Sequence, residues 1–306
     1  MSFKVVSPGI LTLIQDLGRK GFQRVGLSSG GAMDEYAFRL GNALLRNKAN
    51  AAQLEITYGM LTLEVRESTS AALCGADLGA TLNGKSILPW QTYALKRGDL
   101  LAFAQPKYGL RAYLAVAGGL QCDETLGSVS TVMREHVGGL DGKGEKLKKG
   151  DVLKYQPMDD HFQNRVPRHA IPDYSLTEIP LVLGYQYQQF SRIELAHFLS
   201  STYSVSKHFD RMGYRLEGRA IRYDGEGIIS EGIAYGSVQV PNDGQPIVLL
   251  RDRQTIGGYP KIGCITVLGG ALLSQKVAGD RVSFAAITVE EDELERLLFG
   301  HKLKSV

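Results

Sequence analysis

The sequence predicts a mainly β fold of barrels or sandwiches, divided into two domains. Glycine makes up 36 of the 306 residues, above the usual ~7%, and lies between short apolar runs, as turns between strands require. A turn-and-strand pattern occurs three times, and only three segments have helical periodicity. The length is enough for two ordinary domains of roughly 100–200 residues each.

The three predicted helices cover 33–45, 191–201 and 288–298. In "MDEYAFRLGNALL", Asp34 is placed to cap the N-terminus and apolar residues follow at the spacing of one helical face. "SRIELAHFLSS" and "TVEEDELERLL" each begin with a Ser or Thr followed three residues later by Glu, the capping-box pattern. The last residues, "GHKLKSV", are expected to fray.

The remaining chain alternates between short strand-like runs and turns. "LKRGDLLAF", "LKKGDVLKY" and "KVAGDRVSF" each place a Gly-Asp turn before an alternating apolar run. Three copies predict repeated hairpins that build the barrels. The alternative is that Gly-Asp turns are simply common.

The domain division is expected in "PMDDHFQNRVPRHAIPDYSLTEIP". This stretch has four prolines, many polar residues and no period, which is typical of a linker. The prediction is an N-terminal domain over 1–160, a linker over 161–179, and a C-terminal domain over 180–306.

Composition argues against several classes of protein. The net charge of +3 is spread along the chain, so we expect no nucleic-acid partner. No apolar run approaches the ~18 residues of a membrane span, and the N-terminus lacks the pattern of a signal peptide. Three distant cysteines and unpaired histidines favour a cytoplasmic protein and predict no metal site.

One motif resembles a phosphate-binding loop. "GATLNGKS" matches GxxxxGK[ST], but a helix should follow it, and the next residues are "ILPWQTYAL". Asn-Gly between alternating runs is a strong hairpin signal. We therefore expect a hairpin at 79–86.

The candidate site lies in "LLRDRQTIGGYPKIGCITV". Two strand-like runs enclose many polar groups and a double glycine, which permits a sharp turn or close approach to a ligand. Such groups are costly to bury unless paired or placed at a barrel mouth. The pattern favours a site for a small anion or amide-like substrate, and a self-satisfied structural network is the alternative. The residues involved are Arg251, Asp252, Arg253, Gln254, Thr255, Gly257, Gly258, Tyr259 and Lys261.

Two other segments are candidates. In "FDRMGYRLEG", Arg211 lies on a polar turn, where it could bind a carboxylate or phosphate or hold a loop through a salt bridge. In "SSGGAMDEYAFRL", two glycines precede the helix that Asp34 caps. Free amides there could bind an anion, or the segment could be an ordinary helix start.

Taken together, these motifs resemble a known family. "TLIQDLGRKGFQRVG", "GAMDEYAFRLGNALL", "QLEITYGMLTL", "ALCGADLGATLNG", "RAYLAVAGGL", "FDRMGYRLEG", "SVQVPNDGQPIVLLRDRQTIGGYPKIG" and "AGDRVSF" occur in family order over nearly the whole chain. The chain is identified as a member of the KipA type, also called allophanate hydrolase subunit 2 or the biotin-dependent carboxyltransferase A/B domain. The resemblance implies two cyclophilin-like β-barrel domains with a few short helices.

The resemblance also implies functions. Family members include the carboxyltransferase region of urea carboxylase and a stand-alone subunit of bacterial ATP-dependent 5-oxoprolinase. This chain has the length of the second kind. Its expected partners are a KipI-type (B) subunit and a LamB/YcsF-type (A) subunit, its substrate is a small amide, and its cofactors are ATP, bound here or by a partner, and Mg2+.

The family-characteristic polar positions, carried over by motif, are Gln15, Asp16, Arg19, Asp34, Glu55, Arg211, Asp252, Gln254, Thr255, Tyr259 and Lys261. Phe209 and Ile256 depart from the usual motifs and affect pocket polarity. Of these positions, Arg211, Asp252, Gln254 and Lys261 are predicted to be catalytic. Asp34, Arg251, Arg253, Thr255, Gly257, Gly258 and Tyr259 are predicted to bind substrate.

Three functional hypotheses stay open. In the first, ATP activates the amide oxygen of 5-oxoproline, and cations stabilise the developing charge, while Asp252 or Asp34 holds Mg2+ or acts as base. In the second, the same pocket takes carboxybiotin for carboxyl transfer. In the third, the chain is a regulatory module that binds a KipI-type kinase inhibitor.

Overall fold

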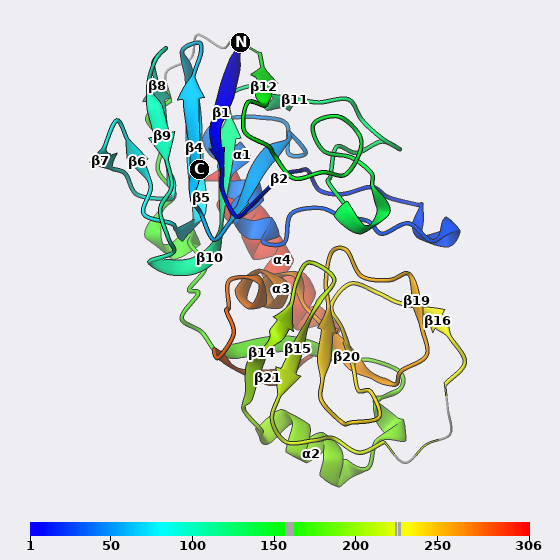
Figure 1. The fold of residues 1–306 in the computed structure, drawn as a ribbon. Coiled ribbons are helices and arrows are strands. Elements are labelled where there is room, and N and C mark those ends of the chain that lie inside the picture. Colours follow the sequence, from blue (N-terminus) through cyan, green and yellow to red (C-terminus); the bar gives the residue numbers. More distant parts are fainter. Residues whose placement is uncertain (157–161, 224, 226–227) are drawn as a thin grey trace. The chain divides into compact units, whose positions relative to one another are not determined.

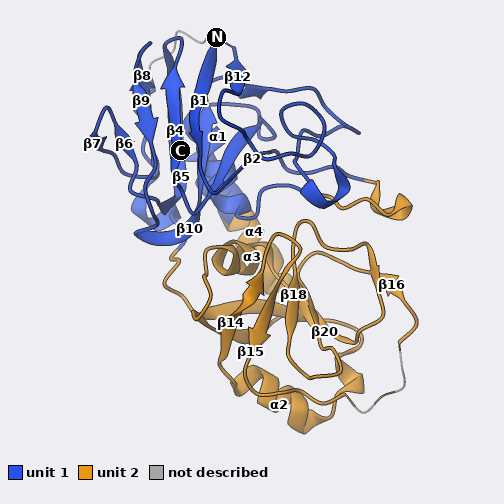
Figure 2. Cartoon of the chain, in the orientation of Figure 1, with its two compact units in different colours: residues 1–20, 30–172, 299–306 blue, residues 21–29, 173–298 orange. Residues whose placement is uncertain are grey.

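The computed structural model describes residues 1–156, 162–223, 225 and 228–306 (Figure 1). These residues form two compact units, coloured separately in Figure 2. The N-terminal unit contains 1–20, 30–172 and 299–306, and the C-terminal unit contains 21–29 and 173–298. The main change of unit thus falls at 172/173. Residue 161 of the predicted linker lies outside the described residues, as does the 157–160 stretch before it.

The N-terminal unit is built from two antiparallel sheets. The seven-stranded sheet has the order β11-β12-β1-β4-β9-β6-β7 and the five-stranded sheet β2-β3-β10-β5-β8. Phe3 and Leu63 of the first sheet share one core with Leu54, Leu73 and Leu114 of the second. The strands are β1 (Ser2–Pro8), β2 (Leu11–Gln15), β3 (Gln53–Thr57), β4 (Leu61–Val65), β5 (Thr69–Asp77), β6 (Thr81–Leu82), β7 (Lys85–Ser86), β8 (Gln91–Leu95), β9 (Leu100–Ala102), β10 (Tyr108–Val116), β11 (Leu120–Gln121) and β12 (Val152–Tyr155).

The C-terminal unit contains a closed barrel. Its strand order is β13-β20-β17-β18-β15-β14-β21, and β21 pairs in parallel with β13 to close the ring. A two-stranded ribbon, β16 with β19, lies outside this ring. The strands are β13 (Glu178–Leu183), β14 (Tyr203–Phe209), β15 (Gly213–Glu217), β16 (Glu231–Gly232), β17 (Ser237–Gln239), β18 (Ile247–Leu249), β19 (Ile256–Gly257), β20 (Lys261–Ile265) and β21 (Arg281–Ile287). The mainly β prediction is confirmed.

Four α-helices occur among the described residues: α1 (Glu35–Leu44), α2 (Arg192–Ser200), α3 (Val267–Ser274) and α4 (Val289–Lys304). None of these helices has the length and apolar character needed to span a bilayer. The predicted caps are confirmed for α1, where Asp34 accepts from the Ala37 N–H, and for α2, where Ser191 accepts from Glu194. Thr288 and Glu291 form the predicted capping box of α4. The prediction of a frayed tail was wrong, because α4 continues to Lys304.

Helix α3 was missed. Its sequence, "VLGGALLS", is apolar on all sides and contains two glycines, so it has no helical stripe by which a helix could be predicted. Thr266 caps it by accepting from the Gly269 N–H, and six of its eight residues are buried. Burial against β13 and β20 stabilises a segment with low helix propensity.

The thrice-repeated pattern is a genuine structural repeat. In each copy the aspartate accepts a hydrogen bond from the backbone N–H three residues earlier, Asp99 from Lys96 (2.7 Å), Asp151 from Lys148 (2.7 Å) and Asp280 from Val277 (2.8 Å). The preceding glycines have φ of +88°, +95° and +93°, which only glycine adopts without strain. Each turn also pairs with one valine of a distant strand, namely Val65, Val5 and Val205.

The hairpin interpretation was wrong for the first and third of these repeats, whereas β12 of the second does pair with the preceding β11, across the long segment between them. Strand β9 pairs with β4 and β6 rather than with the preceding β8. Strand β21 likewise follows a helix and pairs with β13 and β14. The turns are therefore corners that bring the chain to a strand made earlier. By contrast, 79–86 is the predicted hairpin, in which β6 pairs with β7 through Asn83 and Gly84, both at positive φ.

Candidate functional site

A pocket of the C-terminal unit lies over four neighbouring barrel strands. We call it the barrel pocket, and its volume is about 820 Å3. It is lined from β14, β15, β17 and β18 and from the loops that follow β14, β18 and β19. The lining residues are Lys207, His208, Phe209, Asp210, Met212, Gly213, Arg215, Gln239, Ile247, Leu249, Gln254 and Tyr259.

Strand register places part of this lining on the outer face of the barrel. Ile247 lies opposite both Arg215 and Gln239, so the three side chains share one face. The adjacent residues Tyr214, Val238 and Val248 face the other way and are fully buried in the barrel interior. The sequence predicted a polar site at the mouth of a barrel. The structure has instead a pocket against the outer face of the sheet, because strand alternation directs Arg215 and Gln239 outward.

Gln239 is the most unusual member of this lining. It lies in β17, "SVQ", and only 1% of its surface is exposed. Its Nε2 has no hydrogen-bond partner among the described residues. Strand β19 covers it, since a Cβ at Gly257 would lie 3.1 Å from that nitrogen. Gln239 was not among the predicted site residues, and its one weak signal in the sequence was an amide inside an otherwise buried strand.

The loop after β18 is anchored by a buried ion pair. The Arg211 guanidinium donates through Nε and Nη2 to the two carboxylate oxygens of Asp252, each at 2.9 Å. Both residues are 6% exposed. Bidentate geometry is the strongest arrangement for such a pair, and it engages both Asp252 oxygens. The first role of Arg211 and Asp252 is therefore to fix the loop.

Two further arginines flank Tyr235. The Arg251 guanidinium lies 4.4 Å from the centre of the Tyr235 ring and that of Arg253 lies 5.9 Å away. Arg253 also donates to the carbonyls of Ile233 and Leu250. Burial, followed by the neighbouring charge of Arg251, lowers the pKa of Arg253 to about 10. It remains cationic at neutral pH, and its contacts hold the backbone of the loop.

A second network surrounds Lys261. Its ammonium pairs with Glu231, which also accepts from Gln186 Nε2 at 2.8 Å and from the Tyr185 hydroxyl. The side-chain oxygen Oε1 of Gln186 accepts from the Lys261 backbone N–H at 2.9 Å. The hydrogen bond from Lys261 is the main reason that the pKa of Glu231 is lowered. Lys261 thus ties β20 to the β16–β19 ribbon.

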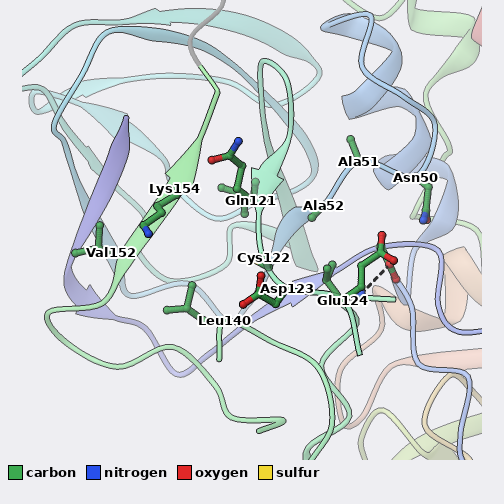
Figure 3. A pocket seen from close by; sticks show the side chains of 13 residues that line it. Asn50, Ala51, Ala52, Gln121, Cys122, Asp123, Glu124, Leu140, Val152 and Lys154 are labelled. Carbon is green, nitrogen blue, oxygen red and sulfur yellow. Dashed lines mark hydrogen bonds between the residues drawn. The ribbon is translucent and has the colours of Figure 1, made fainter. Parts of the chain in front are cut away.

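The N-terminal unit has a pocket of its own, which we call the acidic pocket (Figure 3). Its volume is about 700 Å3, and Asp16, Cys122, Asp123, Glu124 and Lys154 are among its lining residues. Burial, followed by the charge of Asp123, raises the pKa of Cys122 to about 11. The thiol is therefore protonated at neutral pH, which makes it a poor nucleophile.

Asp16 is held by several donors within the N-terminal unit. Its carboxylate accepts from the hydroxyls of Ser128 (2.7 Å) and Ser130 (2.5 Å) and from the N–H groups of Val129 (3.0 Å) and Gly18 (2.8 Å). Oδ1 accepts three of these hydrogen bonds and Oδ2 accepts the one from Val129. The motif residue Asp16 therefore organises a loop.

Comparison with known proteins gives the family. Residues 25–286 match the model of the carboxyltransferase domain, subdomain A and B. The chain belongs to this family. It is 37% identical to the 5-oxoprolinase C subunit of Escherichia coli, over 94% of this chain and 92% of that protein. The corresponding protein of Haemophilus influenzae is 35% identical, over 91% and 89%.

A solved structure of a family relative agrees in fold. The crystal structure of Kluyveromyces lactis urea carboxylase superposes with a TM-score of 0.93 and 26% identity, over 99% of this chain and 29% of that chain. The chain therefore corresponds to less than a third of the urea carboxylase. The resemblance stated from the motifs is confirmed.

The site residues predicted from the family motifs do not all lie together in the structure. Gln254 and Tyr259 line the barrel pocket, and Tyr259 is 45% exposed. Thr255 and Gly257 lie at the β16–β19 ribbon beside it, where their backbones pair with those of Ile233 and Glu231. Gly258 approaches the Ile228 carbonyl so closely that a Cβ on this glycine would lie 3.0 Å from the carbonyl oxygen. Asp34 belongs to the N-terminal unit, where it caps α1 and is fully buried.

Proposed function

We propose that the chain is a subunit of an ATP-dependent 5-oxoprolinase, which opens 5-oxo-L-proline to L-glutamate. The observation that carries this proposal is end-to-end similarity to two proteins that are each named as the C subunit of 5-oxoprolinase, since about nine-tenths of each is covered. The urea amidolyase of Saccharomyces cerevisiae, in contrast, is matched over 17% of its length at 29% identity. A protein of this kind requires other subunits, for which KipI-type and LamB/YcsF-type proteins are our candidates.

The chemistry of the barrel pocket suits this substrate class. An unstrained ring amide resists water, and its opening is assisted by fixed donors at the carbonyl oxygen. Gln254 and Tyr259 provide polar groups at the pocket, and Ile247 and Leu249 provide apolar surface for a carbon ring. The buried Arg211–Asp252 pair holds the loop that carries Gln254. Catalysis by this chain thus consists of binding and orienting the amide.

The described residues offer neither a P-loop for a nucleotide nor a ready cluster of ligands for its magnesium ion. The sequence 79–86 is a hairpin rather than a phosphate-binding loop, and both Asp252 oxygens are engaged by Arg211. In the described part of the chain, no three His, Cys, Asp or Glu side chains are grouped to hold a metal. We therefore assign ATP and Mg2+ to a partner subunit.

The experiment is ATP-dependent release of glutamate from 5-oxoproline by this chain combined with its candidate partner subunits. Full activity should require all components, and Gln254→Ala should reduce it roughly tenfold or more if the amide orients substrate. Gln188→Ala is the matched control, because Gln188 is exposed and absent from the pocket lining. Partner subunits that are fully active without this chain would refute the proposal.

A second candidate is carboxyl transfer with a biotin-dependent enzyme. The TM-score of 0.93 against urea carboxylase favours it. It predicts that activity requires a biotin-carrier protein and is abolished by avidin. Insensitivity to avidin, together with glutamate release from 5-oxoproline, would exclude it.

A further inference from the structure

Helix α4 leaves a stripe of leucines in solvent. Leu294, Leu297 and Leu298 are 56%, 60% and 53% exposed. Their spacing of three and four residues places them on one side of the helix. The opposite side carries Asp292 and Phe299, which are buried. Single exposed leucines are common, but neighbouring ones on one helix face mark a surface that another protein can cover.

The two ends of this helix face carry opposite charges. Glu290 and Glu293 precede the leucines, and His301 and Lys304 follow them, all four with exposed side chains. At 3.6 residues per turn these positions lie on the same side of α4 as the leucines. Glu290 and Lys304 are about 21 Å apart along the axis, well beyond the Debye length of ~8 Å at physiological ionic strength. The acidic and basic ends therefore do not neutralise each other within one helix.

This pattern is complementary to itself in the antiparallel orientation. A two-fold axis through the leucines would place the acidic end of one α4 against the basic end of a second α4, and the reverse at the other end. The leucines of both copies would then meet at the centre, as in an antiparallel helix pair. The opposed helix dipoles also favour this orientation. Parallel helices would instead bring like charges together.

An exposed apolar residue of another helix lacks these features. Ile193 of α2 is 66% exposed, but the residues three and four positions later are Ala196 and His197. It is therefore a single apolar side chain rather than part of a stripe. Ile193 provides a matched control position for tests on α4.

We propose that α4 is a self-association surface, through which two copies of this chain pair with their α4 helices antiparallel across Leu294, Leu297 and Leu298. Helix α4 has 16 residues and is about 24 Å long. One helix pair of this length buries less area than a standard protein interface. The dimer is therefore reversible and dissociates on dilution. It forms without substrate, so this inference is independent of the proposed function.

Sedimentation velocity of the complete chain tests the dimer. Over a range of about 5–500 μM, which brackets weak interfaces, the wild-type chain should convert from monomer to dimer. Leu297→Glu places a charge at the centre of the contact and should weaken association tenfold or more. Ile193→Glu should leave it unchanged. A wild-type chain that stays monomeric, or a Leu297→Glu variant that associates normally, would overturn the inference. Loss of binding to another subunit in Leu297→Glu, with a monomeric wild type, would assign the face to that subunit instead.

Charge reversal tests the orientation. Glu290→Lys/Glu293→Lys makes both ends of the face basic, and His301→Glu/Lys304→Glu makes both ends acidic. In an antiparallel pair each variant alone turns attraction into repulsion and should associate roughly tenfold more weakly than wild type. In a parallel pair like charges already face each other, so neither variant would lose affinity.

A mixture of the two charge variants controls for folding. Equal amounts of the basic and the acidic variant should form a mixed dimer, because opposite charges then meet at both ends. Misfolded helices would not be rescued by mixing. Raising the salt concentration should weaken the wild-type dimer. A mixture that remains monomeric, or a wild-type dimer strengthened by salt, would overturn the inference.

Discussion

In the N-terminal unit, Glu55 accepts hydrogen bonds from the Tyr113 hydroxyl (2.7 Å) and the Met33 N–H (2.8 Å), whereas in the C-terminal unit Gln239 has an Nε2 with no partner among the described residues. Both residues are at most 1% exposed. The N-terminal unit uses buried polar groups to fix its loops and helix α1. The C-terminal unit uses the Arg211–Asp252 pair in the same way, whereas its Gln239 has an unpaired Nε2 and belongs to the residues that line the barrel pocket.

This difference shows that two equally buried polar groups can play different parts in the fold. Burial does not separate them, and neither does residue type. The useful criterion is whether the hydrogen-bonding capacity of the group is met within the protein.

The largest effect is expected for Arg211→Ala. Removing the guanidinium leaves the Asp252 carboxylate, 6% exposed, without its bidentate partner, which should lower the free energy of unfolding by about 3–5 kcal/mol. Urea unfolding of the complete chain measures this. The double variant Arg211→Met/Asp252→Asn should recover part of the loss because no buried charge remains. A stable single variant would show that the pair is not structural.

Next in size is the contrast between Asn42→Leu and Gln239→Leu. Asn42 donates to the carbonyl of Ala51 at 2.9 Å and accepts from Asn47 at 3.1 Å, so its replacement should cost about 1–3 kcal/mol. Gln239→Leu removes an unpaired donor and should be neutral or stabilising. Thermal unfolding of both variants measures this contrast. A larger loss of stability in Gln239→Leu than in Asn42→Leu would contradict the prediction.

The repeated turn allows a matched comparison of the two units. Asp151→Ala and Asp280→Ala each remove one hydrogen bond to a backbone N–H, from Lys148 and Val277 respectively. Each should lower the free energy of unfolding by about 1 kcal/mol. Similar losses measured by denaturant titration would show that the turn is equivalent in both units, and a loss confined to one would refute that equivalence.

The smallest effect concerns acid stability. Because the hydrogen bond from Lys261 lowers the folded-state pKa of Glu231, its stabilisation is fully present above the usual pKa of 4.5 and is lost as the pH falls through the lower folded value. The side chain is 32% exposed, so the contribution is at most about 1 kcal/mol. Lys261→Met should reduce the difference in stability between pH 6 and pH 3, as followed by circular dichroism.

Local patterns predicted much of the fold. Asp34, Ser191 and the Thr288–Glu291 box marked the starts of three helices because capping depends on residues within one turn. The Asn83-Gly84 hairpin was predictable for the same reason. Helix α3 was not, since its helical state depends on burial against β13 and β20. The repeated turn was predicted, but its partners were not, because Val5, Val65 and Val205 are distant in sequence.

The candidate site was predicted less completely. The polar run 251–255 predicted a site in the loop after β18, and of the residues predicted there Gln254 and Tyr259 line the barrel pocket. A count of charged residues could not separate Arg211, Asp252 and Arg253, whose partners are internal, from groups that face the cavity. Gln239 was missed because its importance lies in a missing partner, which no single position in a sequence reveals.

The assignment of residues 299–306 to the N-terminal unit has a consequence for synthesis. The ring of Phe299 stacks on that of Tyr36 with 3.8 Å between centroids, and only 8% of Phe299 is exposed. The ribosome synthesises Tyr36 long before Phe299. The N-terminal unit therefore emerges first but cannot complete its packing until the last helix, α4, has been made. Co-translational folding of this chain therefore cannot proceed as one finished unit followed by another. For the same reason, a gene cut between the two units would give two incomplete products.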